Sequence, residues 1–241
     1  MPRFFAPDIA HTLALPEEEA RHCTRVLRMH EGDVIEVVDG AGRLYQCRIT
    51  LAHDKRCNVE IVEQVSQPAH WGHDIVLAIA PTKNLDRIEW VVEKATEMGI
   101  DRIVPLLCCN SERKVLKTER LHKIAVAAMK QSLKATLPVI DELTPFGRFI
   151  SQPFEGNRFI AYCDPMLPRS ERQLFAQQYV PHAHTLVLIG PEGDFSPEEV
   201  QQALAAGFIP VSLGESRLRT ETAAIMAVAS CHALDMSNPK L

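Results

Sequence analysis

From residue 74 to the C-terminus, short apolar runs of strand length alternate with longer segments of helical periodicity. Nearly continuous apolar strands are typical of a parallel sheet whose two faces are both covered by helices. This alternation therefore predicts an α/β domain. The expected strands are 74–80, 102–107, 158–162, 185–189 and 208–213, and the expected helices are 85–98, 118–133, 196–206 and 220–234.

The first 68 residues follow a different pattern. Residues 34–38, 43–49 and 58–62 alternate between apolar and polar side chains and are separated by polar turns. Short strands at this spacing predict a small β-barrel, preceded by one helix from Pro16 to about Leu27. Ser66-Gln67-Pro68-Ala69-His70 is typical of a linker. We therefore expect a barrel domain at 1–68 and the α/β domain at 73–241.

Charge is unevenly distributed along the chain. The net charge is −5, so a nucleic-acid surface would have to be a local patch. One candidate is the segment 102–134, which holds eight basic and two acidic residues. Another is formed by Arg21, Arg25 and Arg28, which would share one face of the expected helix. Either group could hold phosphates, or it could simply be a solvated surface.

Several classes of protein are disfavoured. Seven cysteines without a C-x-x-C pair predict reduced thiols in a cytoplasmic protein and no zinc site. The N-terminus has no apolar signal segment, and the longest weakly polar run, 222–234, is shorter than the about 20 residues that span a bilayer. The sequence contains no P-loop, which argues against a nucleotide hydrolase. We therefore expect no membrane partner and no metal.

The strongest local signal is Gly190-Pro191-Glu192-Gly193-Asp194, between an apolar strand and a helix that begins with a capping box at Ser196. In an α/β sheet this is the carboxyl end of a strand, where ligands bind. Glycines allow backbone N–H groups to approach a ligand, and the helix start provides positive potential. A tight turn with no ligand is the alternative.

The next strand, 208–213, ends in the same way, with Gly214 and a loop that leads to a helix start where Thr220 or Thr222 could be the cap. Two such strand ends can converge on one ligand. Arg217 and Arg219 alternate along the loop, so one could face the pocket and the other solvent. The sequence thus predicts a functional site between residues 188 and 224.

These residues carry a resemblance to a known family. The chain resembles the bacterial 16S ribosomal RNA uracil-N3 methyltransferases of the SPOUT superfamily over essentially its whole length. Taken together, the shared motifs are specific, although each one alone is weak. They are Arg3-Phe4-Phe5, His22 to Arg28, Gly32-Asp33, Lys94 to Gly99, Ser111-Glu112-Arg113, Gln131-Ser132, Ile189 to Gly193, Leu213-Gly214 and Leu218 to Ala223.

The resemblance implies a PUA-like barrel, a knotted SPOUT-type methyltransferase domain with a C-terminal trefoil knot, and a homodimer in the cytoplasm. It implies S-adenosyl-L-methionine as the methyl donor, and as the acceptor N3 of a uridine near the 3′ end of 16S rRNA, within the 30S subunit. The residues expected to bind the cofactor are Leu188, Gly190, Pro191, Glu192, Gly193, Leu213, Gly214, Leu218, Arg219 and Thr220. Those expected to bind RNA are Arg3, Arg25, Arg28, Lys94 and Arg113.

Arg219 and Glu221 are the expected catalytic residues. Arg219 could stabilise the uracil or steer the cofactor carboxylate, and Glu221 or Glu97 could accept the N3 proton. Capping the last helix is the alternative role of Glu221. Asp194 departs from the family pattern, in which many relatives have a second glycine, and Lys134 stands where arginine is common. The rival functions are a SPOUT enzyme acting on tRNA and a non-catalytic factor of ribosome assembly.

Overall fold

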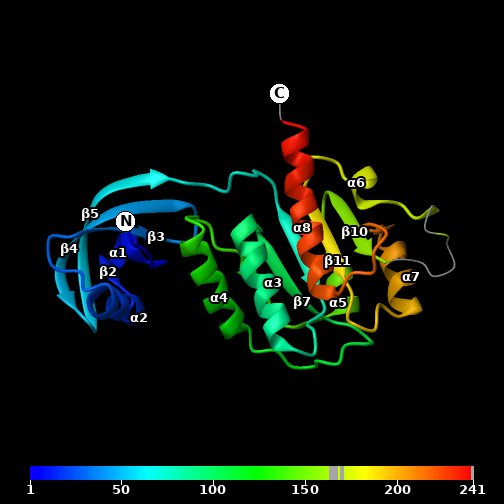
Figure 1. Ribbon diagram of the computed structural model, residues 1–241, viewed down its shortest axis with the longest axis horizontal. Helices are drawn as coiled ribbons and strands as arrows, with labels where there is room; N and C mark the ends of the chain where they lie inside the picture. The colour runs from blue at the N-terminus through cyan, green and yellow to red at the C-terminus, as the bar shows by residue number, and fades with distance from the viewer. Residues whose placement is uncertain (163–167, 169–170, 240–241) are drawn as a thin grey trace. The chain divides into compact units, whose positions relative to one another are not determined.

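The computed structural model (Figure 1) describes residues 1–162, 168 and 171–239. Contacts divide the chain into two compact units. One comprises residues 1–70 together with 126–137, and the other comprises 71–125 and 138–241.

A curled mixed sheet forms the first unit. Its strand order is β1-β3-β4-β5-β2. Strand β1 pairs parallel with β3, and the other pairs are antiparallel. Register shifts between β4 and β5 bend this long hairpin. The strands are β1 (Arg3–Phe5), β2 (Ala14–Leu15), β3 (Val34–Val38), β4 (Arg43–His53) and β5 (Arg56–Ser66).

The helix expected from Pro16 to Leu27 is not a single α-helix. Helix α2 (Glu17–Arg21) continues directly into the π-helix η1 (His22–Val26), and α1 (Ile9–Thr12) lies before both. The wider turn of a π-helix interrupts the 3.6-residue periodicity. The prediction that Arg21, Arg25 and Arg28 share one helix face is therefore wrong, and Arg28 lies beyond the helix with a positive φ of 55°.

A distant segment, 126–137, completes the first unit. Gly42 N–H donates to the carbonyl of Ala135 at 2.9 Å, and Leu137 N–H donates to that of Gly40 at 2.9 Å. Ala135 and Met129 are fully buried beside Val38. The predicted domain boundary at residues 68–73 leaves this segment in the second domain. Hydrogen bonds between residues distant in sequence assign it to the first unit instead.

The second unit contains a parallel sheet in the order β12-β10-β11-β6-β7-β8, with β9 also paired to β7. All five residues of β6 and of β11 are buried, so these strands form its centre. The fold class predicted from the sequence, a parallel α/β domain after a small β domain, is confirmed. The strands are β6 (Ile75–Ile79), β7 (Arg102–Leu107), β8 (Val139–Ile140), β9 (Thr144–Pro145), β10 (Asn157–Ala161), β11 (Thr185–Ile189) and β12 (Ile209–Val211).

Helices cover both faces of this sheet. Helices α3 (Leu85–Met98) and α8 (Thr220–Ser237) pack side by side (Figure 1), and α8 also contacts β6 and β11. On the other face, apolar side chains of α5 (Phe146–Ile150) and α7 (Pro197–Ala205) share a core with β6, β7 and β11. The remaining helices are α4 (Thr118–Gln131) and α6 (Phe175–Gln178). None of the helices in the described residues is both long and apolar enough to cross a membrane.

The helix ends of the second unit follow the sequence closely. Asn84 caps α3 through a side-chain bond from Asp86 N–H, and α3 ends at Gly99. Helix α7 has the predicted capping box, in which Ser196 and Glu199 bond each other's backbone N–H groups. Among the described residues, six cysteines are free thiols and only Cys109 is exposed, while Cys163 lies outside the described residues.

Candidate functional site

A cavity of about 800 Å³ opens at the carboxyl ends of β10, β11 and β12. This volume lies within the range of about 300–1,000 Å³ that is usual for small-molecule sites. Its walls come from the loop between β11 and α7, the loop between β12 and α8, the first turn of α8 and one side chain of α3. Both glycine turns predicted from the sequence therefore reach the same cavity.

The loop after β11 is tightly folded around Phe195. A Cβ atom at Gly190 would lie 3.0 Å from Cε2 of Phe195, so a larger residue would displace the ring or the loop. Asp194 has a φ of 63°, a left-handed conformation that aspartate tolerates better than most residues. Its Oδ1 accepts the Phe195 N–H at 2.8 Å. This local bond gives Asp194 a structural role in holding the turn.

Asp194 also contributes to the electrostatics of the cavity, because it is one of the lining residues. Partial removal from water raises the pKa of the Asp194 carboxyl, and the positive charge of Arg217 acts in the opposite direction. The carboxylate makes this loop a poor cradle for an anion. A neutral ligand group with hydroxyls suits it better.

The loop after β12 leads into α8 without a side-chain cap. Arg219 occupies the N-cap position of α8, and its side chain makes no capping bond. The prediction that Thr220 or Thr222 caps this helix is therefore wrong: Thr220 is the first helical residue and is buried. The first-turn N–H groups of α8 have no partner within the helix. Because Thr220 and Ala223 line the cavity, this positive helix end borders it.

Arg87, on the first turn of α3, connects the two loops. Its NH1 atom lies 3.2 Å from Oε1 of Glu192, and its Nε atom lies 3.6 Å from Oε1 of Glu221. The other carboxylate oxygen of Glu192 accepts the Lys83 N–H at 3.2 Å. Arg87 is not among the site residues predicted from the sequence. Its position in the first turn after β6, the strand beside β11, is a signal that could have identified it.

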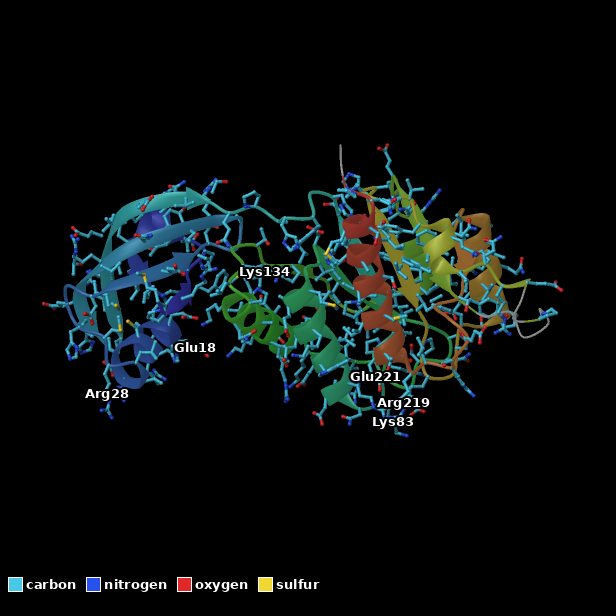
Figure 2. All side chains as sticks on the ribbon, turned by 45° about the horizontal axis from the view of Figure 1, so that its top comes forward. Glu18, Arg28, Lys83, Lys134, Arg219 and Glu221 are labelled. Carbon is cyan, nitrogen blue, oxygen red and sulfur yellow. The ribbon has the colours of Figure 1, made fainter. Side chains whose placement is uncertain are left out.

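Glu221 and Arg219 lie near the start of α8 (Figure 2), where Arg219 lines the cavity. The side chain of Glu221 is 13% exposed, and its Oε2 atom is buried without a hydrogen-bond partner among the described residues. The guanidinium of Arg219 is exposed and has no ionic or hydrogen-bonding partner in the described part of the chain. Arg219 thus offers an uncommitted cation at the cavity, whereas the unpartnered oxygen of Glu221 is buried and Glu221 is not among the lining residues.

The residues expected to bind a cofactor are largely brought together. Leu188 is an exception, because its side chain is fully buried in the core under the sheet. Gly193 also lies outside the cavity wall, where its backbone carbonyl accepts a bond from Asn110. The expected residues that do line the cavity are Gly190, Pro191, Glu192, Leu213, Gly214, Leu218, Arg219 and Thr220.

Several residues expected to bind RNA are engaged within the protein. The side chain of Arg3 is only 7% exposed and pairs with Glu36 at 2.7 Å, which leaves little surface for a phosphate. Lys94 lies between Glu93 and Glu97, and these carboxylates raise the pKa of Lys94. Glu97 is therefore committed to Lys94 near the end of α3, and it does not line the cavity.

The remaining residues expected to bind RNA differ in whether their side chains already have partners within the protein. Arg113 donates to the backbone carbonyls of Thr82 and Lys83, and so buttresses the loop before α3. Arg25 pairs with Asp54 and is exposed. Arg28 is exposed, and within the described residues its side chain has no ionic or hydrogen-bonding partner (Figure 2).

The basic segment 102–134 is partly neutralised by acidic partners from elsewhere in the chain. Arg102 pairs with Asp141 at 2.6 Å, and Arg120 pairs with Glu89 at 2.6 Å. Lys130 pairs with Glu19 at 2.5 Å. The excess of positive charge in the sequence is therefore smaller at the surface than a count along the segment indicates.

Known proteins resemble the chain over nearly its whole length. Residues 70–232 match the RNA methyltransferase domain family, and residues 15–62 match the RNA methyltransferase PUA domain family. A relative from Synechocystis sp., called ribosomal RNA small subunit methyltransferase E, is 31% identical, and the match covers 94% of this chain and 74% of the relative.

Two solved structures share the fold. A "probable rRNA-methyltransferase" from Porphyromonas gingivalis is 46% identical, with a TM-score of 0.93 and coverage of 99% of this chain and 100% of that one. A ribosomal RNA small subunit methyltransferase E from Neisseria gonorrhoeae, bound to S-adenosyl methionine, is 26% identical, with a TM-score of 0.81 and coverage of 97% and 98%. The chain therefore belongs to the RNA methyltransferase domain family, with the PUA domain of such enzymes in its N-terminal part, and is a relative of the proteins called ribosomal RNA small subunit methyltransferase E.

Proposed function

We propose that the protein transfers a methyl group from S-adenosyl-L-methionine to N3 of a uridine near the 3′ end of 16S rRNA. The observation that carries the proposal is the convergence of two glycine loops and the open start of α8 on one cavity. Family membership supports the methyltransferase activity, and the N. gonorrhoeae relative binds the same cofactor. An enzyme that acts on ribosomal subunits would work in the cytoplasm.

The cavity fits this cofactor in size and in chemistry. Gly190 and Gly214 keep its wall free of side chains, so that backbone groups can meet the adenosine part. The Asp194 carboxylate suits a ribose hydroxyl. The uncapped N–H groups of α8 and the guanidinium of Arg219 suit the carboxylate of the methionine part. When bound, S-adenosyl-L-methionine supplies an electrophilic methyl group, which needs no metal.

The protein's remaining task is to handle the uracil. N3 of uracil is only weakly acidic, and negative charge spreads to the ring oxygens as its proton leaves. We assign the stabilisation of this charge to Arg219, one of four arginines that line the cavity and one without an ionic partner in the described residues. We keep Glu221 as the proposed proton acceptor: Arg87 pairs with its Oε1, and its Oε2 is buried next to the cavity wall without a partner in the described residues, so this role requires the first turn of α8 to open toward the uracil. Glu97 is not retained in this role, because it is paired with Lys94.

RNA binding is proposed for the exposed cations of both units. Arg28 has the most freedom to meet a phosphate, and Arg25 could exchange Asp54 for one. In the second unit, Arg113 and Lys94 would act mainly by shaping the surface, because their charges are already paired or bonded. Arg3 is not retained, because it is buried against Glu36.

The proposed reaction predicts stoichiometric methylation of small ribosomal subunits from a strain that lacks this protein. The purified full-length chain, incubated with labelled S-adenosyl-L-methionine, should label these subunits but not fully modified ones. Mass mapping of the digested 16S rRNA should place the methyl group on N3 of one uridine. Labelling of tRNA alone would favour the rival tRNA enzyme. RNA binding without cofactor binding would favour an assembly factor.

We also propose that the protein is a homodimer, with α3 and α8 at the interface. These helices pack together and expose three large apolar side chains, Trp90 at 42%, Met226 at 46% and, near the end of α8, Met236 at 76%. Large apolar side chains exposed on neighbouring helices suit a protein–protein contact. The trefoil knot implied by the family resemblance stays a prediction for the segment that carries the cavity.

Replacing Trp90 with glutamate is expected to convert the dimer to monomers, because a charge would enter an apolar contact. Light scattering after size-exclusion chromatography measures the mass directly. A matched control is Val115→Glu, which changes an apolar residue that is 74% exposed outside α3 and α8. A wild-type protein that is monomeric, or a Trp90 variant that stays dimeric, would contradict the proposed interface.

A further inference from the structure

Three metal-ligating side chains from distant segments meet at the end of α8 that lies away from the cavity. His73 precedes β6, His182 precedes β11, and Asp235 lies in the last turn of α8. One potential ligand atom from each of the three lies within 4.8 Å of the others. The side chains of His73 and Asp235 are only 2% and 9% exposed, and that of His182 is 21% exposed.

The hydrogen bonds of His73 leave a lone pair facing a carboxylate. Nδ1 of His73 lies 2.8 Å from the carbonyl oxygen of Trp71, so Nδ1 carries a proton and donates it to that carbonyl. In a ring protonated at Nδ1 alone, Nε2 would carry only a lone pair, and it lies 3.3 Å from Oδ2 of Asp235. Neither atom has a hydrogen-bond partner among the described residues, although both are buried. In that tautomer two acceptors would face each other, which a cation between them would resolve.

His182 is oriented in the same way. Its Nε2 atom lies 2.5 Å from the carbonyl oxygen of Asn238, which leaves the lone pair of Nδ1 directed to the cluster, 3.7 Å from Oδ1 of Asp235. Asp235 is itself fixed, because its Oδ1 accepts bonds from Tyr179 Oη at 3.0 Å and from the His182 N–H at 2.8 Å. Histidines that ligate metals usually donate their other ring N–H to a carbonyl or carboxylate in this manner.

We propose that His73, His182 and Asp235 form a site for a divalent transition metal ion, with Zn²⁺ as the best fit. Two imidazole nitrogens and one carboxylate oxygen are a common zinc ligand set, with water in the fourth position. Two ligands about 2.0–2.1 Å from a tetrahedral zinc ion lie about 3.3–3.4 Å from each other. The 3.3 Å between His73 Nε2 and Asp235 Oδ2 matches this separation. A cation there would satisfy both buried atoms.

The ion would have a structural role. It would join the end of α8 to the segments that enter β6 and β11, the two central strands of the sheet. The partial exposure of His182 gives the ion a route from solvent. The spacing of the cysteines predicted no metal site, and residue spacing along the chain does not reveal three ligands that only the fold brings together.

The site predicts that the full-length protein, stripped with a chelator and dialysed, binds one Zn²⁺ in calorimetry and gains thermal stability with it. His182→Gln and Asp235→Asn should each weaken Zn²⁺ binding by more than about 100-fold, because loss of even an outer partner costs about 10- to 100-fold. Tyr179→Phe removes the hydroxyl that donates to Asp235, which is such an outer partner. This variant should weaken Zn²⁺ binding by about 10- to 100-fold. Co²⁺ alone should give the visible absorption of a tetrahedral site.

The matched control is His184→Gln, which removes an exposed neighbouring histidine that pairs with Asp74 outside the cluster. This variant should bind Zn²⁺ like the wild type. Asp235→Asn could fail to fold, because Asp235 is buried. In that case the Zn²⁺ affinity of His182→Gln, which changes the most exposed ligand, tests the proposed site. Unchanged thermal stability with Zn²⁺, or equal binding by the His182 and His184 variants, would overturn the site and leave a protonated His73 paired with Asp235.

Discussion

Replacing Arg219 with alanine is expected to lower the rate of methyl transfer by about 100- to 1,000-fold, the usual cost of removing one preorganised stabilising group from a site. Arg219 lies at the N-cap of α8 and lines the cavity, and its guanidinium has no other partner in the described residues. No bond that supports the fold is lost with it. The midpoint of thermal unfolding should therefore stay close to that of the wild type.

The measurement is single-turnover methylation of unmodified small subunits, together with calorimetry of S-adenosyl-L-methionine binding. Weaker cofactor binding in Arg219→Ala would place the guanidinium on the cofactor carboxylate, whereas a slow reaction with normal binding would place it on the uracil. Arg219→Lys should recover only part of the rate, because lysine lacks the planar donor pair. Arg148→Ala, on an exposed position of α5, is the matched control. Wild-type activity of Arg219→Ala would remove Arg219 from the mechanism.

The largest expected effect on stability comes from Gly156→Ala. Gly156 has a φ of 128°, and a Cβ atom there would lie 2.1 Å from the carbonyl oxygen of His184. That carbonyl accepts the Asn157 N–H at 2.8 Å, at the point where β10 and β11 begin to pair. The methyl group would have to push the two strands apart. We expect a loss of about 3 kcal/mol or more, from backbone strain and a clash with rigid backbone.

Chemical denaturation followed by circular dichroism measures this loss. A matched control is Gly214→Ala, because Gly214 has a nearly equal φ of 133°, but apart from its chain neighbours no atom of the described residues lies within 4 Å of the added Cβ. It should show only the backbone strain of about 1–3 kcal/mol. The difference between the two variants isolates the clash with His184. Equal unfolding midpoints would show that the strands yield to the methyl group without cost.

The sequence predicted the second unit well where local chemistry determines structure. Helix α3 and strands β7 and β11 have the predicted bounds, and the capping box at Ser196 is present. Continuous apolar runs and strong helix signals need little tertiary information. The two glycine turns reach one cavity, as expected, because the carboxyl ends of parallel strands lie at one edge of the sheet.

The errors and omissions have a common cause, which is dependence on contacts distant in sequence. The π-helix after Arg21 interrupts the 3.6-residue periodicity of an α-helix. Arg21, Arg25 and Arg28 therefore do not share the helix face that their spacing predicted. Arg87 gains its role from two loops more than a hundred residues away. The burial of Arg3 depends on Glu36, its neighbour across two paired strands. Residue type and spacing alone do not report such pairings.

The position of Arg87 has a consequence for the order of binding events. One guanidinium serves two carboxylates on two different loops, so the loops share a single counterion. A ligand that draws Arg87 toward Glu192 loosens its hold on Glu221, and a ligand that engages Glu221 does the reverse. Thermodynamic linkage requires these effects to be reciprocal. Two molecules that meet in this cavity will therefore alter each other's affinity even where they do not touch.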